Sequence, residues 1–235
     1  MGVGSGRVVH ANVNCTDLER SVVFYRDTLG LSPHTRTAPT EPQPGDAFGL
    51  DRAQWDAWIM AGPGGFAAPV VDLLEWKVPP PVPADGSTLG YRRLRLVGAV
   101  AAAADPDGTA LAVTVGPAAL TGVEVACSDL ARSQRFYDEI VGAPDFFELV
   151  AAPPGSGAAP GAANTVGIWR VALDTADLDA DVAALGAAGV ELVSPPVAMA
   201  MGPGLPVLRF VCFRDPDGAV LELIERPAAA ATRPT

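Results

Sequence analysis

The sequence is poor in lysine, histidine and charged residues generally. Lys77 is the only lysine among 16 basic residues, there are two histidines, and charged residues make up 18% of the 235 positions. Acidic residues outnumber basic ones 27 to 16, which gives a formal net charge of -11. Because no cluster of basic residues is present to neutralise phosphates or anionic lipids, nucleic acids and membrane surfaces are excluded as partners. Apart from Lys77, any anion site must use arginine.

Long hydrophobic runs and paired cysteines are also missing. The apolar stretch at residues 97–104 has eight residues, far below the roughly 20 that span a bilayer. Cys15, Cys127 and Cys212 are an odd number without the spacing of a disulfide framework or a metal site. No secretory leader pattern follows the first methionine. We therefore expect a cytoplasmic protein without a membrane span.

Glycine and proline, by contrast, are abundant, with 25 and 23 residues. Because 49% of the residues are hydrophobic, the chain can still bury a substantial core, and general disorder is excluded. We predict a globular protein with loops rich in proline and glycine at 79–87 and 153–164, and a disordered tail at 228–235.

One segment of the sequence occurs twice. Residues 15–21, Cys-Thr-Asp-Leu-Glu-Arg-Ser, recur at 127–133 as Cys-Ser-Asp-Leu-Ala-Arg-Ser, and the Phe-Tyr pair at 24–25 recurs at the same offset of 112. Each copy follows an alternating apolar segment and begins a pattern of helical period, which predicts a strand followed by an amphipathic helix. We expect the hydroxyl of Thr16 or Ser128 to cap the helix.

Two further repeats indicate a tandem duplication. The turn sequence Asp-Pro-Asp-Gly occurs at 105–108 and 215–218, each time before an apolar strand, and residues 90–96 match residues 167–173. The predicted domains are therefore 7–116 and 119–227. A weaker inner repeat relates residues 71–75 to 221–225. It indicates four strand-helix-strands units, of which the first and the last are complete and the two middle ones are shortened.

These segments resemble a known family. Residues 10–14, 17–21, 24–27 and 29–31 resemble the opening strand and helix of the vicinal oxygen chelate superfamily, which includes glyoxalase I, bleomycin-resistance proteins and extradiol dioxygenases. Residues 213–218 and 221–223 resemble its closing strands. The resemblance to a tandem-domain member implies an α+β fold of paired βαβββ modules whose mixed sheets curl around a cleft.

The resemblance also implies a site. In this superfamily a divalent metal is held by a histidine or glutamine on the first strand of a module and by a glutamate or histidine on the last. The complete units carry His10, Asp72, Arg170 and Glu222 at these positions. His10, Asp72 and Glu222 are therefore the implied catalytic residues and, if the two complete units pair, the implied ligands of Fe, Mn, Ni, Zn or Mg. Since arginine cannot bind a cation, a cleft without a metal is the alternative.

The arginines at these positions have two interpretations. Arg93 and Arg170 occupy the same position in two units, which suggests anchors for a carboxylate, enolate or phenolate of a ligand. The alternative is an internal salt bridge to Asp72 or Glu222, because a buried carboxylate needs a partner. Both interpretations argue against an intact metal centre.

Further candidates for substrate binding lie on the predicted cleft strands: Asn12, Trp58, Trp76, Glu124 and Trp169. An indole that faces the cleft could stack on a planar apolar ligand, although core packing explains most of this aromatic surface. Strand alternation separates Trp55 from Trp58, so at least one of them faces each side of the sheet. Glu124 is a candidate general base.

The resemblance implies several functions. The first is an enzyme of lyase, isomerase or cyclase type that acts on a small oxygenated, aromatic or polyketide-like metabolite. The alternative is a metal-free protein that sequesters a drug or metabolite, as in the bleomycin-resistance branch. An extradiol-type dioxygenase is disfavoured because the second half lacks the two histidines that iron would need. The expected partner is a small molecule, and the chain is expected to be a monomer or homodimer.

Overall fold

The computed structural model describes residues 2–4, 6–84, 86, 88–157, 159 and 161–225; the predicted tail at 228–235 lies outside them. The strands are β1 (Val8–Asn14), β2 (Ser32–Thr37), β3 (Gln43–Pro44), β4 (Arg52–Ala61), β5 (Val70–Val78), β6 (Gly90–Gly98), β7 (Leu111–Val115), β8 (Ala119–Cys127), β9 (Phe147–Ala151), β10 (Gly167–Thr175), β11 (Val197–Ala200), β12 (Val207–Arg214) and β13 (Val220–Glu225). The α-helices are α1 (Leu18–Asp27), α2 (Leu130–Phe136) and α3 (Leu178–Ala187); η1 (Asp46–Phe48) and η2 (Gly65–Ala67) are short 3-10 helices, and η3 (Tyr137–Val141) is a π-helix that follows α2.

Each copy of the first repeat begins a helix, as predicted, but the predicted capping residues are wrong. Asp17 and Asp129 each accept a hydrogen bond from the backbone amide three residues further on. Each aspartate directly precedes its helix, the position from which a side-chain oxygen reaches that amide. Thr16 and Ser128 bind the Asp-Pro-Asp-Gly turns instead.

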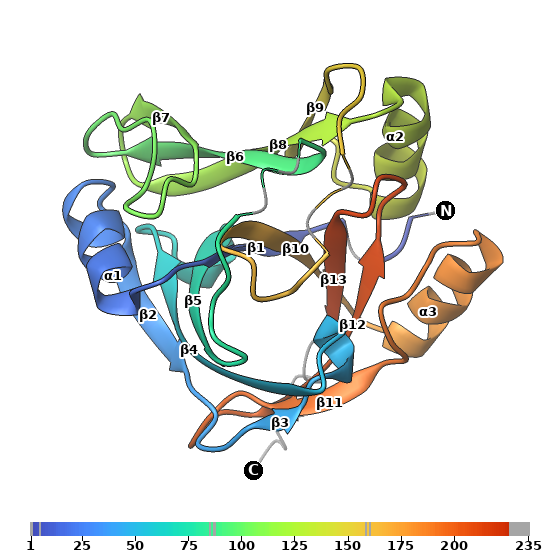
Figure 1. Ribbon diagram of the computed structural model, residues 1–235, viewed down its shortest axis with the longest axis horizontal. Helices are drawn as coiled ribbons and strands as arrows, with labels where there is room; N and C mark the ends of the chain where they lie inside the picture. Colours follow the sequence, from blue (N-terminus) through green and yellow to red (C-terminus); the bar gives the residue numbers. More distant parts are fainter. Residues whose placement is uncertain are drawn as a thin grey trace, which may run out of the picture.

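The two complete units form one sheet and the two shortened units form another. The large sheet has nine strands in the order β11-β12-β13-β10-β1-β5-β4-β2, with β3 added to β4, and the small sheet has the order β7-β6-β8-β9 (Figure 1). Antiparallel pairs join the units, β1 with β10 and β6 with β8, while β1 with β5 and β10 with β13 are parallel. Both sheets are therefore mixed, and both take strands from each predicted half. The boundary between the halves stays a prediction.

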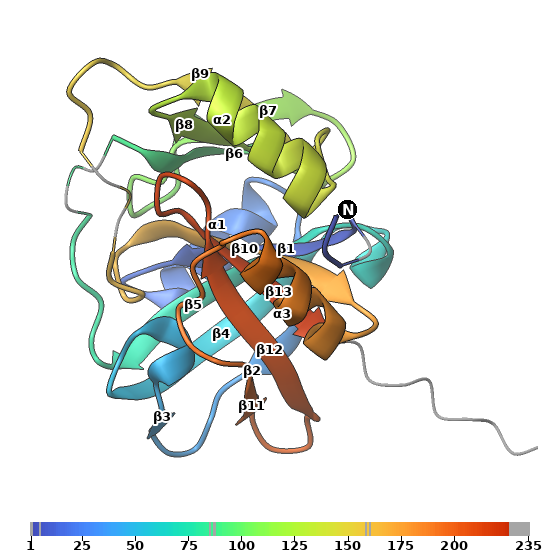
Figure 2. The ribbon, with the colours of Figure 1, turned by 90° about the vertical axis from the view of Figure 1, so that its right-hand side faces the viewer.

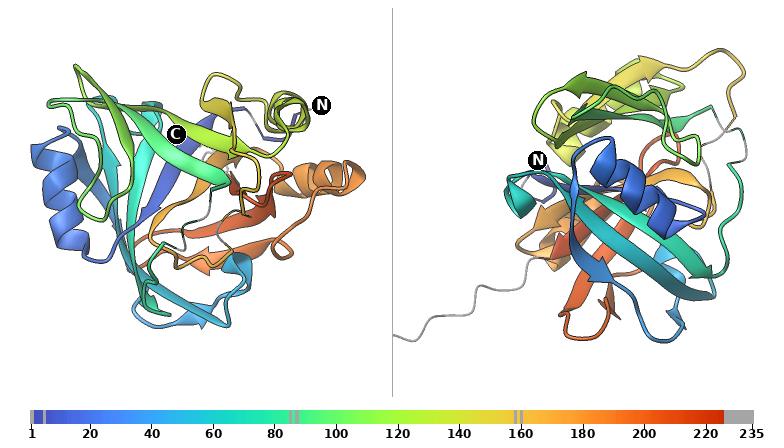
Figure 3. Two further views of the ribbon diagram at one scale, coloured as in Figure 1. Left: turned by 45° about the horizontal axis from the view of Figure 1, so that its top comes forward. Right: turned by 90° about the vertical axis from the view of Figure 1, so that its left-hand side faces the viewer.

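The large sheet curls until its two ends approach each other, as Figures 1 and 3 show. The side chain of Gln43 donates to the carbonyl of Ala200 and accepts from its amide. The amide of Ala38, just after β2, donates to the carbonyl of Met201, just after β11. These bonds join the two edges of the sheet and enclose its concave face.

Two apolar cores explain why the strands of the large sheet are buried on both faces. The larger core lies between the sheets, where Val13 and Val171 of the large sheet pack with Leu94 and Val123 of the small one. Figure 2 shows the small sheet and α2 covering this face. The second core fills part of the curl and includes the rings of Phe48, Trp55, Trp76, Trp169 and Phe210. No helix among the described residues is long and apolar enough to cross a membrane.

Candidate functional site

A cavity of about 310 Å³ lies inside the curl of the large sheet. This volume is at the lower end of the range for small-molecule sites, which is roughly 300–1,000 Å³. Most of its wall is apolar, and four polar side chains from four strands share one region of it. The residues that line the cavity are Val9, His10, Thr35, Thr37, Phe48, Trp55, Ile59, Phe66, Asp72, Leu74, Arg170, Met201, Leu205, Pro206, Leu208, Phe210, Glu222 and Ile224.

The four polar residues are His10, Asp72, Arg170 and Glu222, which we call the polar quartet; all are buried. The guanidinium of Arg170 donates from Nε to Glu222 Oε2 at 2.8 Å and from Nη2 to Asp72 Oδ2 at 3.1 Å. His10 Nε2 lies 3.5 Å from that oxygen of Glu222 and 3.8 Å from that oxygen of Asp72. The structure thus brings together all three predicted catalytic residues and Arg170.

Pairing of the complete units creates the quartet. In the large sheet Asn12 lies opposite Asp72 on β5 and opposite Arg170 on β10. The buried side-chain amide of Asn12 donates to the backbone carbonyl of Asp72 at 3.2 Å and to its Oδ2 at 3.4 Å. Asn12, predicted to bind substrate, therefore orients a carboxylate of the quartet and is not among the residues that line the cavity.

Two atoms of the quartet have no hydrogen-bond partner among the described residues. These are His10 Nε2 and Arg170 Nη1, both buried. A buried polar atom without a partner is costly. Because both side chains line the cavity, an oxygen atom of a bound molecule could satisfy them.

The ion pairs shift the pKa values of Glu222 and Arg170. Burial raises the pKa of the Glu222 carboxyl, but Arg170 and His10 outweigh burial and lower it from 4.5 to about 2. Burial lowers the pKa of the Arg170 guanidinium, but Glu222 and Asp72 outweigh it and the pKa is raised. Glu222 is therefore a carboxylate at neutral pH.

Arg170 also decides whether the implied metal fits. His10, Asp72 and Glu222 converge, but the guanidinium already binds one oxygen of each carboxylate. A divalent cation at those oxygens would lie next to a fixed positive charge. No group of three or more His, Cys, Asp or Glu side chains in the described part of the chain could hold a metal ion. The quartet as folded does not fit the metal that the family resemblance implies. Metal binding by this protein stays a prediction.

The other predicted residues lie elsewhere. Trp76 and Trp169 belong to the aromatic core inside the curl and are not among the lining residues. Trp58 packs against the core between the sheets, on the opposite face. Arg93 and Glu124 lie on β6 and β8 of the small sheet, 3.6 Å from each other. Arg170 alone among the predicted substrate-binding residues lines the cavity.

Sequence reasoning did not assign to the cavity the four aromatic rings of its wall: Phe48, Trp55, Phe66 and Phe210. Trp55 is the tryptophan of β4 that faces the cavity. Strand alternation predicted that Trp55 and Trp58 face opposite sides of the sheet, but not which of them faces the cavity. Phe48 lies on η1, outside the segments that carry the family resemblance. It makes ring contacts with Trp55 at 6.0 Å and Phe210 at 5.7 Å between centroids, and only the curl of the sheet brings these rings together.

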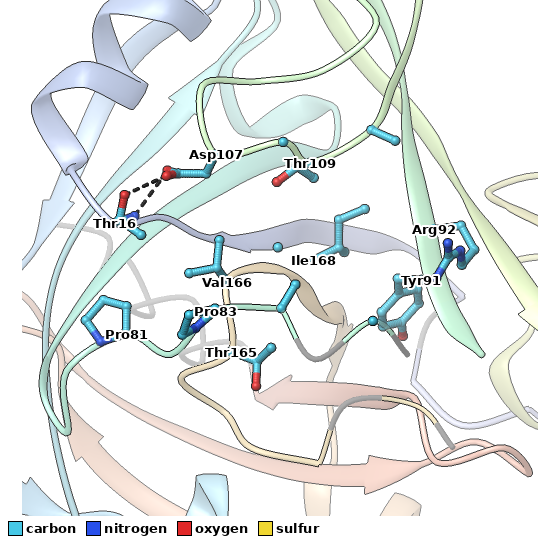
Figure 4. A pocket seen from close by; sticks show the side chains of 15 residues that line it. Thr16, Pro81, Pro83, Tyr91, Arg92, Asp107, Thr109, Thr165, Val166 and Ile168 are labelled. Carbon is cyan, nitrogen blue, oxygen red and sulfur yellow. Dashed lines mark hydrogen bonds between the residues drawn. The ribbon is translucent and has the colours of Figure 1, made fainter. Parts of the chain in front are cut away.

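A second hollow of about 550 Å³ lies between β6, the turn at 107–110 and the segment at 165–168. Figure 4 shows Asp107 at its rim, bonded to Thr16. The Tyr91 hydroxyl, also in its wall, donates to the carbonyl of Val220. None of the polar quartet lines this hollow, so the smaller cavity is the candidate site.

Comparisons with known proteins agree with this architecture. Residues 119–223 match the model of the Glyoxalase/Bleomycin resistance protein/Dioxygenase superfamily.

The structure is similar to glyoxalase I from Zea mays, with TM-score 0.66 and 16% identity, over 93% of this chain and 92% of that chain. It is also similar to a putative dioxygenase from Bacillus subtilis, with TM-score 0.64 and 15% identity, over 97% and 88%. At these identities the likeness shows the fold. A comparison with curated protein sequences finds no match. The chain therefore has the tandem vicinal oxygen chelate fold, and its residues 119–223 match the model of the glyoxalase, bleomycin-resistance and dioxygenase superfamily.

Proposed function

We propose that this protein is a glyoxalase-like enzyme of lyase or isomerase type that acts on a small oxygenated molecule in the cavity, with His10 as the proton-transfer group. One observation carries the proposal: His10 Nε2 is buried and without a hydrogen-bond partner among the described residues, on the wall of an apolar cavity. Imidazole both takes up and releases protons near neutral pH, which suits it to acid–base catalysis.

The neighbours of His10 support this role. Arg170 Nη1 would donate a hydrogen bond to a carbonyl oxygen of the substrate and stabilise negative charge that develops there. His10 would remove a proton from the adjacent carbon, and the carboxylate of Glu222, 3.5 Å away, would stabilise the imidazolium. In an isomerisation the same proton returns to the substrate at another position, so that no further reactant is needed.

The wall of the cavity favours a planar, mostly apolar substrate. Phe48, Trp55 and Phe210 supply aromatic surface, and the threonine hydroxyls of Thr35 and Thr37 add polar contacts. An aromatic or polyketide-like metabolite with one oxygenated end has this chemistry.

Deuterium exchange tests the proton transfer with a probe in place of the substrate. The probe is 2-tetralone, a planar ketone, incubated in D₂O and followed by NMR at the carbons next to the carbonyl. We expect the wild-type protein to accelerate exchange about 100-fold over buffer, and His10→Gln to abolish the acceleration. His34→Gln is the matched control, because His34 is the other histidine and is exposed. Equal exchange by wild type and His10→Gln would refute the role of His10.

The alternative is a metal-free sequestering protein, and one observation favours it: Arg170 binds both carboxylates of the quartet. A protein of this kind would bind the probe with quenching of tryptophan fluorescence, because Trp55 lines the cavity, and would leave its exchange rate at the buffer value. Binding of the probe without faster deuterium exchange would therefore refute the proposed enzyme and support the sequestering protein.

A further inference from the structure

We propose that Arg170 closes a divalent-cation site, so that a small neutral side chain at position 170 lets His10, Asp72 and Glu222 bind one divalent cation. The guanidinium bridges Asp72 and Glu222 and supplies the positive charge that a metal would otherwise supply. This inference concerns cation binding and does not depend on the proposed enzyme activity.

The internal repeat places Arg170 at a ligand position. Asp17, the N-cap residue of α1, corresponds to Asp177, the N-cap residue of α3. At this offset of 160 residues, His10 corresponds to Arg170. The last strands correspond too, because Glu75 accepts from the first amide of α1 as Glu225 accepts from the first amide of α3.

Asp72 and Glu222, each three residues before these glutamates, are equivalent in the same way. The quartet therefore contains two pairs of equivalent positions. Three of the four side chains are common metal ligands, and the fourth is the guanidinium.

Two distances from His10 are close to those between the ligands of one metal ion. Ligand atoms about 2.1 Å from one cation lie about 3.0–3.5 Å from each other in octahedral or tetrahedral geometry. His10 Nε2 lies 3.5 and 3.8 Å from the two carboxylate oxygens that bind Arg170. The nitrogen has no hydrogen-bond partner among the described residues, so a cation would not have to displace one.

The charges explain why Arg170 and a metal exclude each other. With Arg170 in place, one positive charge already serves both buried carboxylates. Without it, two buried carboxylates would remain with no permanent cation, and a divalent ion would restore the balance. A small side chain at position 170 would also leave empty the space beside the cavity that the guanidinium now fills.

The test measures metal binding directly. Wild type and the Arg170→Ala and Arg170→Gln variants, without a histidine tag, are loaded with Co²⁺ or Zn²⁺, passed through gel filtration and assayed by elemental analysis. Circular dichroism and thermal unfolding with and without the ion report folding. Arg93→Ala is the matched control, because Arg93 holds the same repeat position but pairs with Glu124 on the small sheet, with a side chain 46% exposed.

We expect about one ion per chain in Arg170→Ala, bound at least about 100-fold more tightly than by wild type, together with a higher Tm in its presence. Adding His10→Ala to this variant should remove the binding. Arg170→Gln serves if the alanine variant folds poorly. Stoichiometric metal in the wild type that is lost with His10→Ala would overturn the proposal, and so would folded Arg170 variants that bind no more than Arg93→Ala.

Discussion

At the scale of single residues, one arginine sets the chemistry of the site. Arg170 holds both carboxylates of the quartet, while its Nη1 and the nearby His10 Nε2 have no hydrogen-bond partner among the described residues. The prediction of an internal salt bridge is confirmed for Arg170, which bridges both candidate partners. Its equivalent Arg93 lies at the surface of the other sheet. Identical sequence positions thus have different environments, because only one lies inside the curl.

The low pKa of Glu222 predicts how stability depends on pH. Since the folded pKa, about 2, lies below the ordinary 4.5, this carboxylate stabilises the fold above pH 4.5, and its contribution is lost as the pH falls toward 2. The contribution is on the order of 3 kcal/mol. We expect the free energy of unfolding, measured with denaturant between pH 6 and 3, to fall less in Glu222→Gln than in the wild type.

A control separates this effect from other acidic groups. Glu191→Gln removes an exposed carboxylate near Arg214 and should keep the wild-type pH profile. Burial raises the pKa of Asp105 and Asp215, so these groups favour the folded state at low pH and oppose it as the pH rises. They are present in every variant and cancel in the comparison. Identical profiles for wild type and Glu222→Gln would contradict the prediction.

At the scale of elements, the duplicated turns join the two sheets. Asp107, after β6 of the small sheet, accepts from the amide and hydroxyl of Thr16 and from Arg20 at the start of α1. Asp217, before β13 of the large sheet, binds Ser128 and Arg132 at the start of α2 in the same way. The repeated sequence motif is therefore a pair of clamps between units of different sheets.

Removal of a clamp should loosen the contact between the sheets. We expect Asp107→Ala and Asp217→Ala each to lower the free energy of unfolding by about 1–3 kcal/mol, because each leaves donors without a partner. Hydrogen exchange should also become faster at the amides of β6 and β8. The double variant should show the sum of the two effects, since the sites share no partner.

The matched control is Asp27→Ala, which removes an exposed carboxylate that binds only its neighbour Arg26 in the described structure. Such a surface pair contributes about 0–1 kcal/mol. If the clamp variants were no less stable than Asp27→Ala, the aspartates would not hold the sheets together.

At the scale of the whole molecule, neither predicted half contains a complete sheet. β1 of the first half pairs with β10 of the second, and β6 of the first half pairs with β8 of the second. The core between the sheets also contains residues of both halves. We therefore expect residues 1–117 and 118–235, produced separately, to remain unfolded or to self-associate, and to form a 1:1 complex when refolded together. Size-exclusion chromatography with light scattering measures the stoichiometry. A stable, folded monomer of either half would contradict this expectation.

The sequence by itself determined the units, their order and the residue types of the site. Repeats are visible because each unit needs the same strand, cap and turn chemistry locally, and the resemblance to the superfamily rests on those segments. The segments between them were hard to assign, and η1 with Phe48 was not predicted, because its place depends on distant strands. Only the tertiary structure decided that the first and last units pair, since strand pairing is a contact between residues far apart in the chain. That pairing places Arg170 between Asp72 and Glu222, and the buried ion pairs that result raise the pKa of Arg170 and lower that of Glu222.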